Sequence, residues 1–295
     1  MKILVTGASG ILGSAICKSF SSNEDNVQFF NRALFLQSKN IEYINFLLGF
    51  DCIVHAAANT NVEECEINPQ LCYRDNTLLT ENLAVSAEQA GCKFVYISST
   101  GIYGSSKETD PYTEYDEVTP TTHHHKSKWL GEKAVKSNCS NPLILRAGWI
   151  FGGAPDRPKN FVAKRIEEAL NAKFKKIQSN SQQRGVPTFA NDFALMLREM
   201  LKKDEVGTFN VVNQGFASRM EYVSKILEIA EIDVDVLPAP SNSFERKANV
   251  SLNETAVGLK LFQLNYAQLP HWEISLKNYI HTDLKQWLTH VKNNG

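Results

Sequence analysis

The chain has 295 residues and a formal net charge of −1, and 43% of its residues are hydrophobic and 21% charged. These values are ordinary for a globular protein and argue against a nucleic-acid or membrane-surface binder. No stretch reaches the roughly 20 apolar residues of a membrane span. The chain starts directly in a strand-like segment, and its six cysteines include no CxxC pair, so we expect free thiols in a reducing cytoplasm.

Short apolar runs alternate with helical patterns over the first 150 residues. The predicted strands are Lys2–Thr6, Val27–Phe30, Cys52–His55, Phe94–Ile97 and Leu143–Leu145, and the predicted helices are Ile11–Phe20, Pro69–Ala90 and Ser127–Lys136. Apolar strands separated by helices are typical of a parallel sheet that is covered on both faces. The pattern therefore predicts a doubly wound α/β fold, with its ligand edge at the carboxyl ends of the strands.

The pattern loosens after Arg146. The later predictions are a Gly/Pro/charge loop at Gly152–Lys159, helices at Phe161–Asn171, within Val186–Leu201 and at Ser218–Ile229, and a strand at Phe209–Val212. We expect that strand to rejoin the sheet. The predicted organisation is a larger domain of residues 1–150, joined by 186–230, and a smaller C-terminal lobe of 151–185 and 231–295.

A glycine-rich loop, Thr6–Gly13 (TGASGILG), joins the first strand to the first helix. Gly7 can make the tight turn, Gly10 lets a pyrophosphate approach the backbone, and Gly13 lets the helix pack on the strand. The helix N-terminus then offers free N–H groups and a positive dipole end to phosphates. The context predicts a Rossmann-type nucleotide site; a tight turn without a ligand is the alternative.

The end of the second strand indicates which dinucleotide binds. NAD-binding proteins usually carry an acidic residue there, on the ribose hydroxyls. This chain has Asn31 and Arg32 instead, and a guanidinium can pair with a 2′-phosphate. We therefore expect NADP(H), with an ordinary surface arginine as the alternative.

Four segments occur in a characteristic order: TGASGILG, VHAAANTNVEECEINP, YISSTGIYG and KSKWLGEKAV. With them the chain resembles the extended short-chain dehydrogenase/reductases, and most of all the dTDP-4-dehydrorhamnose reductase family. The resemblance covers nearly the whole chain, including a G-x-P-T segment at Gly185–Thr188 and ERKANVSLN around Arg246. It implies an NADP-binding Rossmann domain and a substrate-binding lobe, and it leaves a homodimer open.

The resemblance implies NADPH-dependent reduction of a nucleotide-linked 4-keto-deoxy sugar for polysaccharide synthesis. In the family a tyrosine supplies the proton, and a lysine four residues later holds the nicotinamide ribose from the same helix face. Lys128 matches this lysine, and Ser99 matches the hydroxyl residue that polarises the carbonyl. Thr100 stands where the family usually has an acid, and Gly101 where it has a larger residue, so both changes bear on the identity of the sugar.

The resemblance also implies a wider set of contacts. The expected cofactor contacts are Gly7, Ser9, Gly10, Ile11, Leu12, Gly13, Asn31, Arg32, Ala56, Ala57, Ala58, Asn76 and Lys128. The expected substrate contacts are Thr60, Val62, Trp149 and Arg246. Core packing is the competing explanation for Val62 and Trp149. Arg146 could hold diphosphate oxygens or form a structural salt bridge.

The tyrosine position holds His124. A literal YxxxK does occur at Tyr103–Lys107, but it follows Ser99 too closely and lies among Gly and Ser turn residues. A neutral imidazole N–H at His124 could polarise a carbonyl, with its pKa lowered by the neighbouring Lys128. The proton would then come from water or another relay. An engineered Tyr→His change is a further explanation.

Two other interpretations of His124 stay open, and a metal site is a third that we reject. The chain could be a catalytically silent NADP-binding subunit that regulates or scaffolds a partner; the regulatory beta subunit of methionine adenosyltransferase is similar to the same reductase family. It could also be a sugar-nucleotide epimerase or dehydratase, although these tend to show an acid after the second strand. We expect no metal at His123–His125, because adjacent helical residues point about 100° apart.

Overall fold

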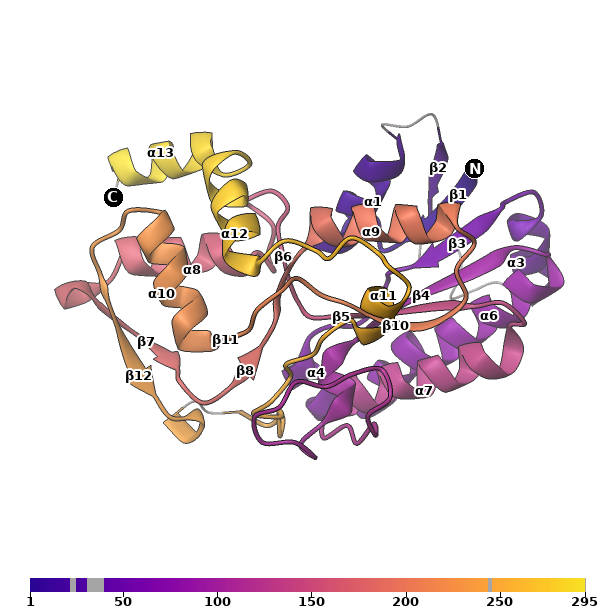
Figure 1. The fold of residues 1–295 in the computed structure, drawn as a ribbon, viewed down its shortest axis with the longest axis horizontal. Helices are drawn as coiled ribbons and strands as arrows, with labels where there is room; N and C mark the ends of the chain where they lie inside the picture. Colours follow the sequence, from indigo (N-terminus) through magenta and orange to yellow (C-terminus); the bar gives the residue numbers. More distant parts are fainter. Residues whose placement is uncertain (22–24, 31–39, 244–245, 295) are drawn as a thin grey trace.

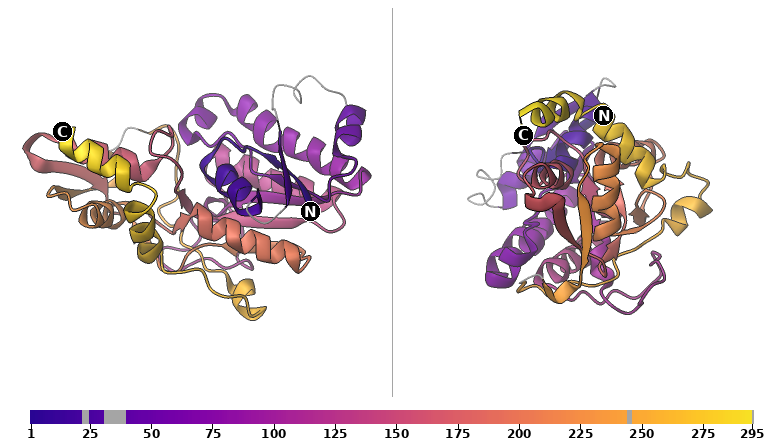
Figure 2. Two further views of the ribbon diagram at one scale, coloured as in Figure 1. Left: turned by 90° about the horizontal axis from the view of Figure 1, so that it is seen from above. Right: turned by 90° about the vertical axis from the view of Figure 1, so that its left-hand side faces the viewer.

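The computed structural model describes residues 1–21, 25–30, 40–243 and 246–294. Figure 1 shows a larger lobe, which holds the N-terminus and the main sheet, and a smaller lobe, which ends in the C-terminal helix. The left view of Figure 2 shows the same two-lobed outline from above. Among the described residues, no helix is both long and apolar enough to cross a membrane.

The main sheet is parallel throughout and has the order β10-β5-β4-β3-β1-β2. Its strands are β1 (Lys2–Thr6), β2 (Asn26–Phe29), β3 (Cys52–His55), β4 (Lys93–Ser99), β5 (Leu143–Ala147) and β10 (Gly207–Val211). This topology confirms the predicted doubly wound α/β fold and the return of the late strand to the sheet. The register pairs Thr6 with His55 and Ser99 with Ala147, so the carboxyl ends of four strands form one edge.

Helices cover both faces of this sheet. The helices α1 (Ile11–Ser21) and α9 (Ala190–Lys202) lie on one face, and α3 (Asn40–Leu47), α6 (Leu79–Gln89) and α7 (His123–Asn138) on the other. Phe20 and Phe193 are fully buried on the first face, and Leu83 and Phe94 on the second. Burying such a side chain contributes about 1.5–3 kcal/mol to the stability of the fold, so packing against helices on both faces stabilises the sheet.

The segment predicted as one helix over Pro69–Ala90 is helical throughout but not uniform. It consists of α5 (Pro69–Tyr73), a π-helical turn η1 (Arg74–Leu78) and α6. π-turns inside helices frequently occur at functional sites. This one carries Asp75 and Asn76, both buried below the sheet edge.

Helix α7 begins at His123, four residues before the predicted start. Its N-cap is Thr122, whose Oγ1 accepts the backbone N–H of His125 at 3.1 Å. A threonine cap of this kind contributes about 1 kcal/mol. The cap places all three histidines and Lys128 in the first two turns.

The smaller lobe has its own core, which contains Phe151, Phe189, Tyr222 and Tyr279. Its elements are α8 (Phe161–Leu170), β7 (Lys176–Asn180), α10 (Arg219–Ile229), β12 (Asp235–Ala239), α12 (Trp272–His281) and α13 (Lys285–Asn294). The remaining short elements are α4 (Val62–Ile67), η2 (Thr100–Tyr103), β6 (Trp149–Phe151), η3 (Lys173–Lys175), β8 (Arg184–Gly185), β9 (Pro187–Phe189), β11 (Ala217–Ser218), η4 (Ser241–Ser243) and α11 (Leu259–Gln263). Within 186–230, α9 and β10 pack on the main sheet and α10 packs in the smaller lobe. The domain boundaries stay predictions.

Candidate functional site

A cavity of about 1090 Å³ opens at the carboxyl edge of the main sheet. Thirteen of the residues predicted for the site line it: Gly7, Ser9, Gly10, Ile11, Leu12, Gly13, Ala56, Ala57, Ala58, Thr60, Ser99, His124 and Lys128. Sites for small molecules usually measure roughly 300–1,000 Å³. A cavity slightly larger than that range can hold a dinucleotide beside a second ligand.

The glycine loop forms one wall, and its geometry requires glycine. Gly7 has φ 69°, and a Cβ there would lie 2.7 Å from the backbone nitrogen of Ala57. A Cβ on Gly13 would lie 2.1 Å from the Gly7 carbonyl oxygen. A Cβ on Gly10 would meet only that same oxygen, at 3.2 Å, so the cavity side of the loop is open. Because the first N–H groups of α1 have no partner within the helix, the loop fits a pyrophosphate.

Two consecutive serines end β4 at the cavity wall. The Oγ atom of Ser99 accepts the N–H of Gly101 at 3.2 Å, which leaves its own O–H able to donate to a ligand. Ser98 also lines the cavity, and its buried Oγ has no hydrogen-bond partner among the described residues. Thr100 is buried in η2 and does not line the cavity.

Lys128, in α7, also lines the cavity. Its Nζ is 4.2 Å from the centre of the Tyr96 ring, a cation–π geometry. Burial lowers the pKa of Lys128 to about 7, although the Glu132 carboxylate opposes this shift. The ammonium therefore gives up its proton more readily than that of an exposed lysine.

His124 is buried one turn before Lys128 and also lines the cavity. Its Nδ1 lies 3.0 Å from the backbone carbonyl oxygen of Asn59. Burial lowers its pKa well below 6.5, and the nearby His125 and Lys128 lower it further. The imidazole is therefore neutral at neutral pH.

The two flanking histidines point elsewhere. His123 places its ring Nδ1 3.0 Å from the hydroxyl of Tyr73, and its backbone N–H donates to Glu66. The Nδ1 of His125 lies 3.1 Å from Oγ1 of Thr122. No cluster of three His, Cys, Asp or Glu side chains within the described ranges is arranged to hold a metal ion.

Asn76, predicted as a cofactor contact, is buried behind the cavity wall. Its Oδ1 accepts the N–H of Asn59 at 2.7 Å, and its Nδ2 donates to the carbonyl of Asn59 at 3.0 Å and to Oγ of Ser127 at 3.0 Å. Asn76 therefore fixes the loop that holds His124.

The other predicted residues do not line the cavity. Val62 begins α4, and Arg246 is exposed on the segment before β-bridge residue Asn253. The indole N–H of Trp149 donates to Glu254 at 2.6 Å, and the guanidinium of Arg219 stacks 3.4 Å from its ring. Arg146 forms a buried bidentate salt bridge with Glu132. Asn31 and Arg32 lie outside the described residues.

The sequence predictions missed three charged residues of the cavity wall, Asp75, Arg157 and Lys159. Arg157 donates to the carbonyl of Ser9 at 2.8 Å, and Lys159 donates to Oγ1 of Thr60. Both cations belong to the Gly/Pro/charge loop that the sequence marked only as a connection. The signal in the sequence was the pair of cations in this short loop, although no spacing in the sequence linked them to the glycine loop.

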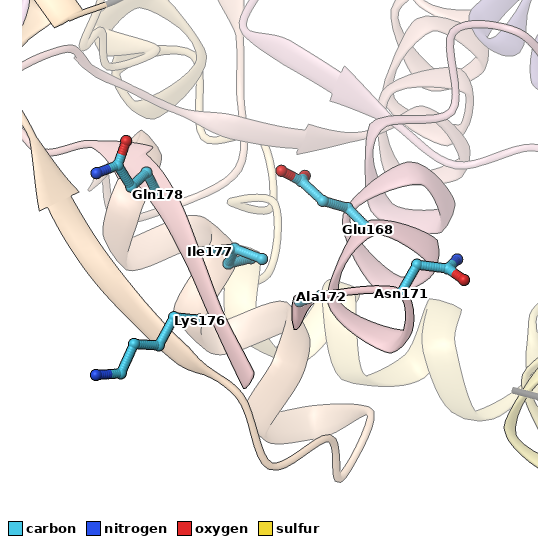
Figure 3. A pocket seen from close by; sticks show the side chains of 6 residues that line it. All are labelled: Glu168, Asn171, Ala172, Lys176, Ile177 and Gln178. Carbon is cyan, nitrogen blue, oxygen red and sulfur yellow. The ribbon is translucent and has the colours of Figure 1, made fainter. Parts of the chain in front are cut away.

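A second hollow lies on the smaller lobe, between the end of α8 and β7 (Figure 3). Its six lining residues are Glu168, Asn171, Ala172, Lys176, Ile177 and Gln178. In Figure 3 these side chains do not converge on one point. The chemistry therefore belongs to the cavity at the sheet edge.

The model of the RmlD substrate binding domain matches residues 1–284. Among solved structures, a dTDP-4-dehydrorhamnose reductase from Clostridium acetobutylicum has 29% identity and a TM-score of 0.90, with 97% of this chain and 100% of that chain covered. The dTDP-4-dehydrorhamnose reductase of Bacillus anthracis in complex with NADP has 27% identity and a TM-score of 0.88, with 95% and 99% covered.

Two curated relatives widen the comparison. The spore coat polysaccharide biosynthesis protein SpsK of Bacillus subtilis is 26% identical, over 83% of this chain and 85% of its own length. The methionine adenosyltransferase 2 subunit beta of Bos taurus is 28% identical, over 68% of this chain and 62% of its own length.

Proposed function

The chain belongs to the RmlD substrate-binding domain family, and on that premise we propose that it is an NADP(H)-dependent oxidoreductase of nucleotide-linked sugars. Its substrate pair is a 4-keto-deoxy sugar and the corresponding 4-hydroxyl sugar. The relatives from Clostridium acetobutylicum and Bacillus anthracis are named dTDP-4-dehydrorhamnose reductases, and the second was solved in complex with NADP. The observation that carries this proposal is one cavity that holds the glycine loop, Ser99 and Lys128.

The Gly7–Gly13 loop and the start of α1 bind the pyrophosphate of the dinucleotide, and Lys128 holds the nicotinamide ribose. The O–H of Ser99 donates to the sugar oxygen. Bound NADPH would supply the hydride. The choice of NADP(H) over NAD(H) is supported by the NADP complex of the Bacillus anthracis relative and by the lack of an acid at Asn31–Arg32.

Titration and turnover test the proposal. We expect NADPH to bind more tightly than NADH, and tighter NADH binding would contradict the cofactor assignment. Incubation with NADPH and dTDP-4-dehydrorhamnose should change the absorbance of the reduced nicotinamide. A Gly13→Ala variant, whose Cβ has no room beside Gly7, should lose NADPH binding while its fold is checked by circular dichroism.

A second candidate is a catalytically silent NADP-binding subunit. The specific observation in its favour is that His124 replaces the proton-donating tyrosine and directs its Nδ1 at a backbone carbonyl. The relative named as a subunit of methionine adenosyltransferase supports the same interpretation. Tight NADPH binding without turnover of any 4-keto or 4-hydroxyl sugar nucleotide would favour this candidate.

A further inference from the structure

The protonation pattern of His124 follows from its hydrogen bond to Asn59. A backbone carbonyl can only accept, so Nδ1 of His124 must carry the hydrogen of this 3.0 Å contact. In a neutral imidazole one ring nitrogen donates and the other accepts. The remaining nitrogen, Nε2, is therefore an acceptor, and it has no hydrogen-bond partner within the described part of the chain.

The Asn59 carbonyl that selects this tautomer is held in place by Asn76. The side chain of Asn76 forms two hydrogen bonds with the backbone of Asn59. Its Oδ1 accepts the Asn59 N–H at 2.7 Å, and its Nδ2 donates to the Asn59 carbonyl at 3.0 Å. Asn76 is itself fully buried and also donates to Ser127 of the same helix as His124. Helix α7 and the loop after β3 are thus locked together around the imidazole.

The charges around His124 keep it neutral. His125 and Lys128 face it from its own helix, and Lys159 faces it from the loop after β6; all three disfavour a second proton. The hydrogen bond to the Asn59 carbonyl acts in the opposite direction, and Asp75, which also lines the cavity, is paired with Arg74. Burial is the largest influence and acts in the same direction as the three cationic or basic neighbours.

We infer that this cavity binds a nucleotide-linked sugar with a free hydroxyl at the reacting carbon in preference to the corresponding ketone. This inference rests on the proposed function. The hydroxyl oxygen receives a hydrogen bond from Ser99 and gives its own hydrogen to Nε2 of His124. A ketone at the same carbon has no hydrogen to give, so a lone pair of its oxygen would face the lone pair on Nε2 of His124.

The family's tyrosine can donate and accept at one oxygen, whereas neutral His124 can only accept at Nε2. Full proton transfer to Nε2 and proton donation from it both involve the imidazolium, which burial and the neighbouring bases disfavour. The preference for the hydroxyl sugar therefore concerns ligand binding and does not depend on the direction of turnover.

Ligand binding tests the inference without turnover. Calorimetry at neutral pH is carried out on two pairs that cannot react, NADPH with dTDP-rhamnose and NADP⁺ with dTDP-4-dehydrorhamnose. One additional hydrogen bond should favour the hydroxyl sugar by about tenfold in the natural chain. The preference should vanish in His124→Phe and shift toward the ketone in His124→Tyr. Since each variant is measured with the same two pairs, any effect of the cofactor cancels between variants.

His123→Phe is the matched control, because His123 does not line the cavity, and it should keep the preference. Nitrogen NMR of the histidine-labelled protein gives a second readout, with Nδ1 of His124 protonated and Nε2 unprotonated at neutral pH. The opposite tautomer, an imidazolium, or equal binding of both sugars would overturn the inference and leave the proposed function standing. Failure of both sugars to bind would overturn both.

Discussion

The ring of His125 occupies the space that a side chain on residue 101 would need. A Cβ built on Gly101 would lie 2.2 Å from Nε2 of the buried His125 ring. His125 is held there by Thr122, which also caps helix α7. The glycine at position 101 is therefore matched to the histidine that packs against it.

A Gly101→Ala substitution should destabilise the protein by about 1–3 kcal/mol, because the extra methyl group overpacks a filled core. His125→Ala alone should also destabilise it, because it leaves a cavity and removes the ring contact of Thr122, whose Oγ1 keeps the backbone N–H of residue 125. The double variant should lose less than the sum of the two, as measured by urea unfolding. Additive losses would show that the two side chains do not share one space.

The buried pair of Arg146 and Glu132 gives the second prediction. The two hydrogen bonds measure 2.9 and 2.8 Å, and both side chains are at least 97% buried. A Glu132→Gln variant leaves an uncompensated guanidinium and should lose about 3–5 kcal/mol in unfolding free energy. Glu199→Gln breaks an exposed pair with Lys202 and should lose only about 0–1 kcal/mol. Similar losses in both variants would contradict the structural assignment of Arg146.

The larger lobe could be predicted because its signals are local. Continuous apolar strands such as Cys52–His55 are buried on both faces, and the Gly7–Gly13 spacing leaves few alternatives. The resemblance assigned Ser99, His124 and Lys128 to one site, and all three line one cavity in the structure, while their roles stay predictions.

The missed features depend on contacts between distant segments. Arg157 and Lys159 join the wall only because their loop crosses to Ser9 and Thr60, which are more than 90 residues away in the chain. The π-turn at Asn76 has no periodicity that distinguishes it from a helix. The role of His124 depends on a backbone carbonyl, which no side-chain pattern reveals.

Asn76 provides the third prediction. An Asn76→Ala variant leaves the partly buried N–H of Asn59 without its partner and should destabilise the protein by about 1–3 kcal/mol. It should also loosen the Asn59 carbonyl, so that the NMR signals of His124 report a mixture of tautomers. Asn171→Ala, at the exposed end of α8, is the control. An unchanged His124 spectrum in Asn76→Ala would show that Asn76 does not position the loop.

Lys128 provides a prediction for the pH dependence of stability. Burial lowers its pKa to about 7 in the folded protein, whereas a free lysine titrates near 10.4. Folding therefore releases a proton between about pH 7 and pH 10. Above about pH 10 the lysine is neutral in both the folded and the unfolded protein, and its burial costs no stability. As the pH falls toward 7, the free energy of unfolding decreases, because folding must then either bury the charged ammonium or remove its proton.

A Lys128→Met variant removes this cost. Its gain in unfolding free energy over the natural chain should be largest at about pH 7 and should shrink as the pH approaches 10. Urea unfolding of both proteins over this range measures the difference, in which the titrations common to both cancel. Lys164→Met, on the exposed face of α8, shows the effect of losing a surface lysine. A gain in Lys128→Met that grows with pH would mean that Lys128 stays charged in the folded protein, with its ammonium stabilised by Glu132 and the Tyr96 ring.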